Sequence, residues 1–306
     1  MELRVLQYFL AVAREQNISK AAESLHLSQP TLSTQLKNME EELGRKLFWR
    51  GTKGSRKIVL TEEGVILRKR AEEILDLVQK TEQEITQSDE TITGDVYIGA
   101  GETDTIRLIA KTACALQERF PQIHYHISSG NATFVMEQLD KGLIDFGILY
   151  DNVDLTRYDS VRLPVKDIWG VLMRKDSPLA EKEAICPKDL WNQPLILSQQ
   201  ETQNSDLAVW LKRDFSRLNI SVTYNLLFNG SLFVDEGMGY AICLNKIINV
   251  SGESNLCFRP LSPELQATAY LVWKKYQVFS KAAAYFLECL RKDLDKSTNP
   301  EADSDL

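Results

Sequence analysis

Residues 9–50 read FLAVAREQNISKAAESLHLSQPTLSTQLKNMEEELGRKLFWR, and this stretch decides the fold of the amino-terminal part of the chain. Apolar residues recur at helical spacing over residues 2–15 and predict an amphipathic helix. They are Leu3, Leu6, Phe9, Leu10 and Ala13. Ser19 can cap a short second helix. Ser28 can cap a third, in which Pro30 occupies the first turn, where its missing N–H costs nothing. The pattern therefore predicts a helix-turn-helix.

The third helix, residues 29–44, has one apolar and one polar face. The apolar face is spaced for packing into a core and consists of Leu32, Leu36, Met39 and Leu43. The polar face suits a recognition helix, because short or flexible polar side chains can pair with base edges in the major groove. The residues predicted to contact DNA from this face are Gln29, Thr31, Ser33, Thr34 and Lys37, the last at a phosphate.

A basic loop follows this helix. Two β-prone segments, LFWR and KIVL, flank GTKGSRK and together predict a wing. Its candidates for contacts with phosphates or an adjacent minor groove are Arg50, Lys53, Arg56 and Lys57. Residues 1–60 carry a net charge of +4, whereas the whole chain carries −7. A polar helix alone would be ordinary solvated surface, but the consecutive order of helices, turn and basic wing favours DNA binding.

These sixty residues resemble the amino-terminal signature of the LysR-type transcriptional regulators. The resemblance rests on A-A-x-x-L-x-x-S-Q-P from Ala21, L-F-x-R from Leu47 and L-T-x-x-G from Leu60. It implies an α+β protein with a winged helix-turn-helix DNA-binding domain over residues 1–60, a linker helix, and a two-lobed α/β effector domain resembling periplasmic binding proteins. Within the helix-turn-helix, Ile18 to Lys37, it assigns base contacts chiefly to Gln29, Pro30, Ser33 and Thr34.

Residues 61–90 are expected to form the linker and to dimerise. Thr61 can cap a helix over about 62–88. An apolar stripe typical of helix pairing between subunits consists of Leu67, Ala71, Ile74, Leu75, Val78 and Ile85. We expect a homodimer or tetramer on double-stranded operator DNA with dyad symmetry, and RNA polymerase as a further partner. The alternative is that the stripe packs against the effector domain of its own chain.

From Gly94 onward, β-prone and helical runs alternate, which predicts an α/β domain. We expect the effector domain over 91–293, with lobe 1 at about 91–162 and 262–293, lobe 2 at about 163–261, and a disordered acidic tail at 294–306. The resemblance implies a small-molecule effector between the lobes, lined by Gly101, Glu102, Thr103, Ser129, Asn131, Ser198, Gln200, Phe228 and Asn229. Helix capping explains several of these polar residues equally well. Glu102 argues against a simple anionic effector, so a cationic or neutral one stays open.

Metal and thiol chemistry find little support in the sequence. His124 and His126 share a strand face, but no third ligand is near in sequence, so a strand-surface role is favoured over a metal site. Cys243 and Cys257 lie in apolar runs, which favours buried packing over a thiol sensor. We therefore expect no metal and no cofactor other than the effector.

The sequence leaves three rival classes of protein to weigh. A solute-binding protein of the periplasmic type shares the two lobes. However, Glu2 and Glu15 interrupt the apolar run at the start of the sequence, so we expect no signal peptide there, and the wing would be unexplained. A DNA-acting enzyme would need a motif such as G-x-S-x-G, H-E-x-x-H or a P-loop, and these are absent. An architectural DNA binder without a ligand is not excluded. No apolar run approaches the roughly 18 residues of a membrane span, so we expect a cytoplasmic protein without membrane contact.

Overall fold

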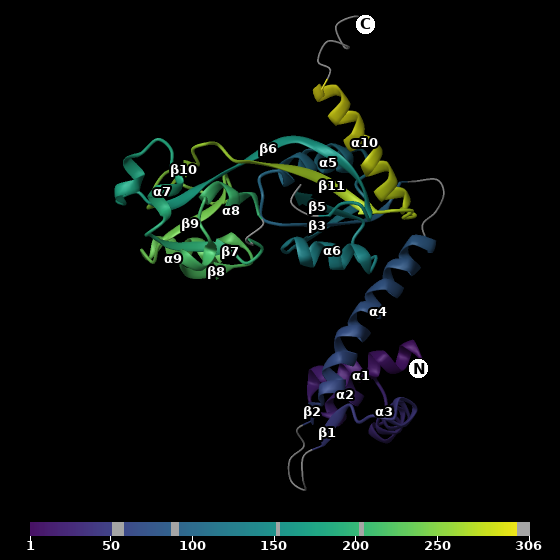
Figure 1. The fold of residues 1–306 in the computed structure, drawn as a ribbon. Coiled ribbons are helices and arrows are strands. Elements are labelled where there is room, and N and C mark those ends of the chain that lie inside the picture. The colour runs from purple at the N-terminus through teal and green to yellow at the C-terminus, as the bar shows by residue number, and fades with distance from the viewer. Residues whose placement is uncertain (51–57, 87–91, 151–153, 202–204, 299–306) are drawn as a thin grey trace, which may run out of the picture. The chain divides into compact units, whose positions relative to one another are not determined.

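The computed structural model describes residues 1–50, 58–86, 92–150, 154–201 and 205–298. The chain forms two compact units, which we call unit 1 (Met1–Gln87) and unit 2 (Ser88–Leu306) (Figure 1). Among the described residues, no helix is both long and apolar enough to cross a membrane.

Unit 1 consists of three short helices, a two-stranded sheet and a long helix (Figure 1). In chain order these are α1 (Leu3–Glu15), α2 (Ile18–Ser24), α3 (Gln29–Leu43), β1 (Phe48–Arg50), β2 (Ile58–Leu60) and α4 (Glu62–Thr86). The two strands pair antiparallel, with Trp49 opposite Val59. The order of helices and strands predicted from the sequence is therefore confirmed.

The helix-turn-helix is fixed by two side-chain caps. Asn17 caps α2, because its Oδ1 accepts hydrogen bonds from backbone N–H groups of the first turn, including that of Ser19 at 2.9 Å. The prediction that Ser19 itself caps this helix was wrong, because Ile18 is already helical. Ser28 caps α3 as predicted, and its hydroxyl accepts from the N–H of Thr31 at 3.2 Å.

The core of unit 1 includes the first half of α4. Phe9 and Ala71 are fully buried in this core. Three more residues of the predicted dimer stripe pack against the same core, namely Leu67, Ile74 and Leu75. α1 contacts α4, so Ala71 belongs to the core of unit 1, while Leu67, Ile74 and Leu75 are only partly buried against it.

Unit 2 is built on one mixed sheet (Figure 1). Its first elements are β3 (Gly94–Ala100), α5 (Ile106–Arg119), β4 (Ile123–Ser129), α6 (Ala132–Asp140), β5 (Phe146–Tyr150) and β6 (Tyr158–Arg174). They are followed by a 3₁₀ turn (Pro178–Glu181), α7 (Pro187–Leu190), β7 (Pro194–Ser198), α8 (Asp206–Leu211), a second 3₁₀ turn (Phe215–Arg217), β8 (Asn219–Tyr224) and α9 (Leu227–Asp235). The last elements are β9 (Tyr240–Leu244), β10 (Leu256–Pro260), β11 (Gln266–Lys274) and α10 (Lys281–Thr298).

The long strands β6 and β11 join two α/β lobes (Figure 1). The strand order is β4-β3-β5-β11-β6-β9-β7-β8, and β10 pairs with β6. β6 pairs with β11 up to Ile168 and with β9 from Trp169, so the two lobes meet at this point of the strand. The pairs β3–β4, β3–β5, β7–β8 and β7–β9 are parallel. Parallel neighbours require crossover connections, which contain α5, α6, α8 and α9 here. The predicted two-lobed α/β fold is therefore confirmed.

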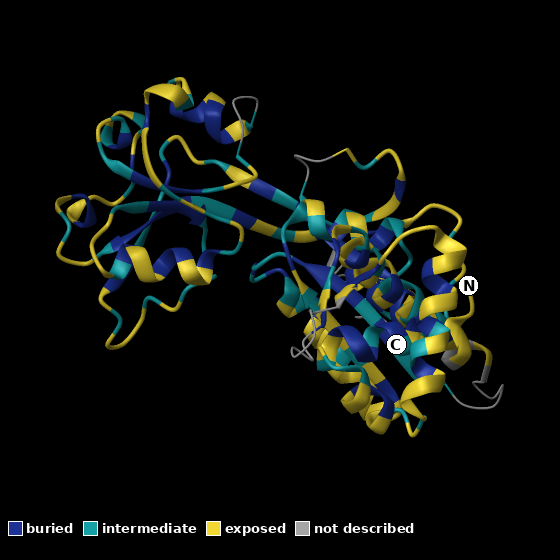
Figure 2. Ribbon diagram, turned by 90° about the horizontal axis from the view of Figure 1, so that it is seen from below, coloured by how far each residue is buried: buried dark blue, intermediate teal, exposed yellow. Residues whose placement is uncertain are grey.

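Buried residues are concentrated in the strands, and the outer faces of the helices are exposed (Figure 2). In the first lobe α10 packs on the sheet, and its Phe286 lies 5.6 Å from Phe146, ring centre to ring centre. The helix continues to Thr298 and buries Leu294. The prediction that a disordered tail begins at residue 294 was therefore wrong for residues 294–298, because these residues belong to α10. Residues 299–306 lie outside the described residues.

Candidate functional site

α3 presents its polar face to solvent. The exposed residues include Gln29, Pro30, Thr31, Thr34 and Lys37, whereas Ser33 is partly exposed. Leu32, Leu36 and Met39 are buried on the opposite face. Leu43, which was expected in the core, is 42% exposed, because α3 ends there and the chain turns away at Gly44 with a φ of 64°.

Lys37 is the cation on this face. It pairs with Glu41 at 3.3 Å, and both side chains are largely exposed. Exposed pairs of this kind contribute little to stability, on the order of 0.5 kcal/mol. Lys37 can therefore exchange its carboxylate partner for a DNA phosphate at small cost.

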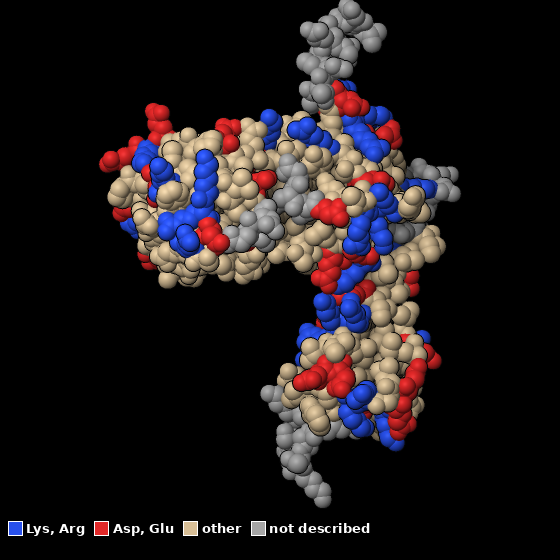
Figure 3. Space-filling model, in the orientation of Figure 1, with Lys and Arg blue, Asp and Glu red and all other residues tan. Residues whose placement is uncertain are grey.

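Three of the four predicted wing residues lie outside the described residues. Arg50 ends β1, while Lys53, Arg56 and Lys57 fall in 51–57, outside the described residues. Residues 1–49 contain six basic and six acidic side chains, so the excess positive charge of the first sixty residues resides in 50–57. Figure 3 shows acidic and basic side chains mixed on the visible face of unit 1.

A buried carboxylate ties β1 to α3, the predicted recognition helix. Glu40 of α3 accepts hydrogen bonds at Oε1 from the backbone N–H groups of Leu47, at 2.8 Å, and Phe48, at 3.3 Å. Its Oε2 lies 3.4 Å from the ammonium of Lys46. Because the Glu40 side chain is only 2% exposed, these bonds are shielded from water. The sequence reading did not find this role, since Glu40 lies in the run of three glutamates at 40–42.

The L-T-x-x-G motif has a similar function at the second strand. Thr61 caps α4 as predicted, accepting from the N–H of Gly64 at 3.0 Å, and its hydroxyl donates to the carbonyl of Lys46 at 2.7 Å. A Cβ on Gly64 would lie 2.2 Å from the carbonyl oxygen of Leu47. Only glycine permits this approach, so the motif holds the start of α4 against the segment before β1.

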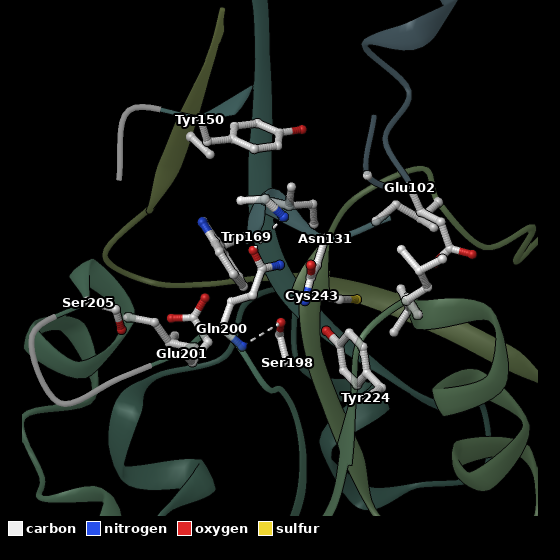
Figure 4. A pocket seen from close by; sticks show the side chains of 18 of the residues that line it. Glu102, Asn131, Tyr150, Trp169, Ser198, Gln200, Glu201, Ser205, Tyr224 and Cys243 are labelled. Carbon is white, nitrogen blue, oxygen red and sulfur yellow. Dashed lines mark hydrogen bonds between the residues drawn. The ribbon is translucent and has the colours of Figure 1, made fainter. Parts of the chain in front are cut away.

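The second candidate site is a cleft in unit 2 with about 1020 Å³ of empty space, part of it open to solvent. Residues that follow β3, β4, β7 and β8 line it, together with residues of β5, β6, β9 and β11. Both lobes contribute to the walls (Figure 4). The carboxyl ends of parallel strands are the edge at which α/β folds bind ligands.

Five of the nine residues assigned to a cleft line this space, namely Gly101, Glu102, Asn131, Ser198 and Gln200. Two hydrogen bonds cross between the lobes here. Gln200 Oε1 accepts from the N–H of Ala132 at 2.9 Å, and Glu102 Oε2 accepts from the N–H of Phe228 at 3.1 Å. Both donors lie in the first turn of a helix, α6 and α9 respectively.

Three of the other predicted residues lie away from the cleft lining. Ser129 is exposed at the end of β4. Phe228 is 60% exposed and Asn229 is also exposed, because α9 already begins at Leu227 and turns these side chains outward. The loop predicted at this position is instead Asn225 and Leu226, which do line the cleft.

Thr103, the ninth residue, belongs to a buried polar cluster behind the cleft. Asp167 of β6 is 2% exposed, and its Oδ2 accepts from the hydroxyls of Thr103 at 2.8 Å and Thr105 at 2.9 Å. The hydroxyl of Tyr150 lies 2.5 Å from the same oxygen. Burial and this carboxylate raise the pKa of Tyr150. The cluster links the start of α5 to the strand that joins the lobes, and Tyr150 connects it to the cleft wall.

The sequence reading missed the aromatic and two of the acidic residues of the cleft. They are Tyr150, Trp169, Glu201, Asp206 and Tyr224. Tyr150 and Tyr224 are the last residues of β5 and β8, and Glu201 directly follows Gln200. A search restricted to strand ends would therefore have found three of them.

Burial governs the chemistry of the cleft side chains. It raises the pKa of Glu201, opposed by a hydrogen bond from Ser205 and supported by the charge of Asp206. It also raises the pKa of Tyr224 well above its usual value, with contributions from Glu201 and Glu102. Figure 4 shows the side chains of Glu201 and Glu102 on opposite sides of the cleft.

The two cysteines considered as a sensor lie on opposite faces of the sheet. Cys243 packs in one core of the second lobe with Leu172, and Cys257 packs in the other with Met173. β6 runs between their strands, which separates them by two strand spacings, about 10 Å, too far for a disulfide. Burial raises the pKa of the Cys243 thiol to about 12, so it stays protonated at neutral pH.

The histidine pair on β4 has surface partners. His126 Nε2 lies 2.8 Å from Asp95 Oδ1, and its ring stacks on Tyr97 at 4.6 Å between ring centres. His124 is exposed. Within the described part of the chain, no three His, Cys, Asp or Glu side chains are placed to hold a metal ion.

Comparison with known proteins identifies both units. Residues 3–65 match the family described as "Bacterial regulatory helix-turn-helix protein, lysR family", and residues 89–295 match "LysR substrate binding domain". The chain belongs to the LysR family. This LysR-family protein is a DNA-binding transcriptional regulator with an effector-binding domain and is not an enzyme, as the sequence predicted.

Two relatives show how far the similarity of this LysR-family protein extends. It is 31% identical over 224 residues to the HTH-type transcriptional regulator BsdA of Bacillus subtilis, covering 72% of this chain and 74% of that one. It is 30% identical over 200 residues to the hydrogen peroxide-inducible genes activator of Pectobacterium carotovorum. That alignment covers 64% of each chain, slightly less than two thirds of the relative's length.

Among solved structures, full-length CbnR complexed with its target DNA is similar to this LysR-family protein with a TM-score of 0.72. The match covers 95% of this chain and 99% of that one at 19% identity. At this identity the similarity shows a shared fold.

Proposed function

We propose that this protein binds an operator with dyad symmetry through α3 and the basic residues among 50–57, and that a small molecule in the unit 2 cleft controls its effect on transcription. The observation that carries the proposal is the cleft itself, in which both lobes contribute polar side chains at strand ends. A ligand that touches both lobes can favour one arrangement of them over another and so act as an effector.

The proposal includes a dimer or tetramer built through α4. Four residues of the stripe lie in or against the core of unit 1. Other apolar side chains of α4 remain exposed, namely Val65, Ile66, Leu77 and Ile85. Ile66 and Leu77 are about three helical turns apart and so share a face. This face supports pairing with a second copy. RNA polymerase is proposed as the partner through which the assembly acts in the cytoplasm.

The DNA-binding part is tested with fragments that the purified full-length protein selects from genomic DNA. Gln29→Ala is expected to weaken binding to a selected site by about ten- to a hundredfold while leaving binding to random DNA nearly unchanged, because it removes a base contact. Lys57→Ala is expected to weaken both and to lower the slope of log affinity against log salt by about one, because it removes a phosphate contact.

Gln7→Ala is the matched control, since Gln7 is an exposed glutamine on α1, outside α2 and α3. It should bind both DNAs like the wild type. Equal losses for Gln29→Ala and Lys57→Ala on both DNAs would contradict the assigned roles.

A further inference from the structure

The cleft is acidic. Three carboxylates line it, Glu102, Glu201 and Asp206, while no Lys, Arg or His lines it among the residues described. The undescribed residues of unit 2 are 88–91, 151–153, 202–204 and 299–306, and their sequence contains no Lys, Arg or His. An anionic ligand in this cleft would therefore meet three like charges and no opposing one among the lining residues, and the neighbouring Lys246 is paired with Asp104 at 3.8 Å.

The backbone groups that usually bind anions are occupied by the protein's own side chains. The start of a helix attracts anions because its first N–H groups are free and the helix dipole is positive there. At α6, however, the N–H of Ala132 donates to Gln200 Oε1 at 2.9 Å. At α9, the N–H of Phe228 donates to the Glu102 carboxylate at 3.1 Å. The Glu102 carboxylate thus takes the position that an anionic effector would take at α9.

Aromatic rings form another part of the cleft wall. Trp169, Tyr150 and Tyr224 line it. The hydroxyl of Tyr224 donates to the carbonyl of Ile242 at 2.9 Å, and that of Tyr150 lies against the buried Asp167. Because both hydroxyls already have partners, the tyrosines contribute mainly their ring surfaces. Aromatic faces attract cations through the ring quadrupole and pack against apolar groups.

We propose that the effector is an organic cation, an amine or a guanidine with an apolar body, held by the carboxylates of Glu201 and Glu102 and by the rings of Trp169 and Tyr224. The inference rests on the proposed function, because it takes the cleft as the effector site. Glu201 is the main counter-ion. Glu201 is partly buried and close to Asp206, and both features disfavour its ionised form when the cleft is empty. A ligand cation beside Glu201 offsets this free-energy cost.

The test is a thermal-shift screen of the full-length protein against small metabolites in equal numbers of amines, guanidines, neutral compounds and carboxylates. Phenethylamine, 2-phenylethanol and phenylacetate form a matched set that differs mainly in charge. Ligands that raise the melting midpoint are then titrated by calorimetry. The proposal expects amines or guanidines among the ligands found, and it is overturned if only neutral compounds or carboxylates bind, or if no cation binds.

Two variants test whether the carboxylate of Glu201 binds the ligand cation. Glu201→Gln is expected to weaken binding of the cation by about ten- to a hundredfold, because it removes a charge-assisted interaction. Glu253→Gln makes the same charge change at an exposed residue outside the cleft lining and should leave binding unchanged. Binding of the cation to the wild type should strengthen as the pH rises, because Glu201 ionises. The other titratable groups that face it across the cleft are Glu102, Asp206 and Tyr224. Glu201→Gln should reduce this dependence of affinity on pH. Equal affinities of the wild type and Glu201→Gln would overturn the proposal.

A third variant separates this inference from the proposed function. Ala132→Phe narrows the cleft without changing its charge, since Ala132 lines it. If carboxylates bind the wild type but not Ala132→Phe, the effector cleft stands and the cationic effector is wrong. If ligands of every class bind the Ala132→Phe variant as tightly as the wild type, the cleft is not the effector site and both proposals fail.

Discussion

Replacing Glu40 by alanine should loosen β1, the first strand of the predicted wing, without removing any side chain that faces DNA. Glu40 Oε1 accepts from the buried N–H of Leu47 at 2.8 Å and more weakly from that of Phe48 at 3.3 Å. A buried donor left without an acceptor costs about 1–3 kcal/mol. The ion pair with Lys46 adds little, because the lysine side chain is 69% exposed. The expected loss is therefore about 2–3 kcal/mol.

Glu40→Gln is the matched control, because its side-chain carbonyl can still accept from Leu47 and only the charge is lost. We expect this variant to lose about 1 kcal/mol. The assay is amide hydrogen exchange of the full-length protein, read by mass spectrometry on a peptide covering residues 45–50. The two expected losses differ by about 1–2 kcal/mol, and 1.4 kcal/mol corresponds to a factor of ten. This peptide should therefore exchange about five- to thirtyfold faster in the alanine variant than in the glutamine variant.

Binding of operator DNA should fall in the same order, since the wing would no longer be fixed relative to α3. If the alanine and glutamine variants exchange at the same rate in this peptide, Glu40 does not hold β1 and the reasoning is refuted. Faster exchange throughout unit 1 in both variants would instead indicate a general loss of the core.

Two further predictions concern packing and thiol reactivity. Gly64→Ala should destabilise unit 1 by about 2 kcal/mol, because overpacking against the Leu47 carbonyl at 2.2 Å exceeds the gain in helix propensity of about 1 kcal/mol; an unchanged urea midpoint of unit 1 would contradict this. Iodoacetamide near neutral pH should modify the exposed Cys114 and Cys186 in the folded protein but not Cys243, which is buried and has a pKa raised to about 12. Peptide mass spectrometry checks this, and rapid labelling of Cys243 before unfolding would show that the site opens.

The sequence predicted unit 1 well because its signals are local. Ser28 and Thr61 cap helices through N–H groups only three residues away, and the spacing of Leu32 and Leu36 alone decides which face of α3 is buried. The errors in this unit are also local. Asn17 and Ser19 are both good caps, and only the backbone conformation decides between them.

The cleft was predicted only in part because its residues come together through tertiary structure. Glu102 and Phe228 are 126 positions apart in the chain, and Ala132 and Gln200 are 68 apart. Family resemblance located the loops, but it did not distinguish Thr103, which turns inward to Asp167, from Glu102, which faces the cleft. The acidic character of the cleft depends on Glu201 and Asp206, which line the same cleft as Glu102 but were not predicted from the sequence.

The stripe on α4 shows what an apolar pattern can and cannot establish. Its spacing correctly indicated that one face of this helix is buried, but burial on a neighbouring helix of the same unit and burial on a second copy require the same spacing. Ala71 is fully buried against unit 1, so that part of the pattern is already explained. Ile66 and Leu77 lie outside the predicted stripe and remain exposed. The proposed dimer interface on α4 is therefore expected to include these two residues together with Ile85, a member of the predicted stripe that is also exposed.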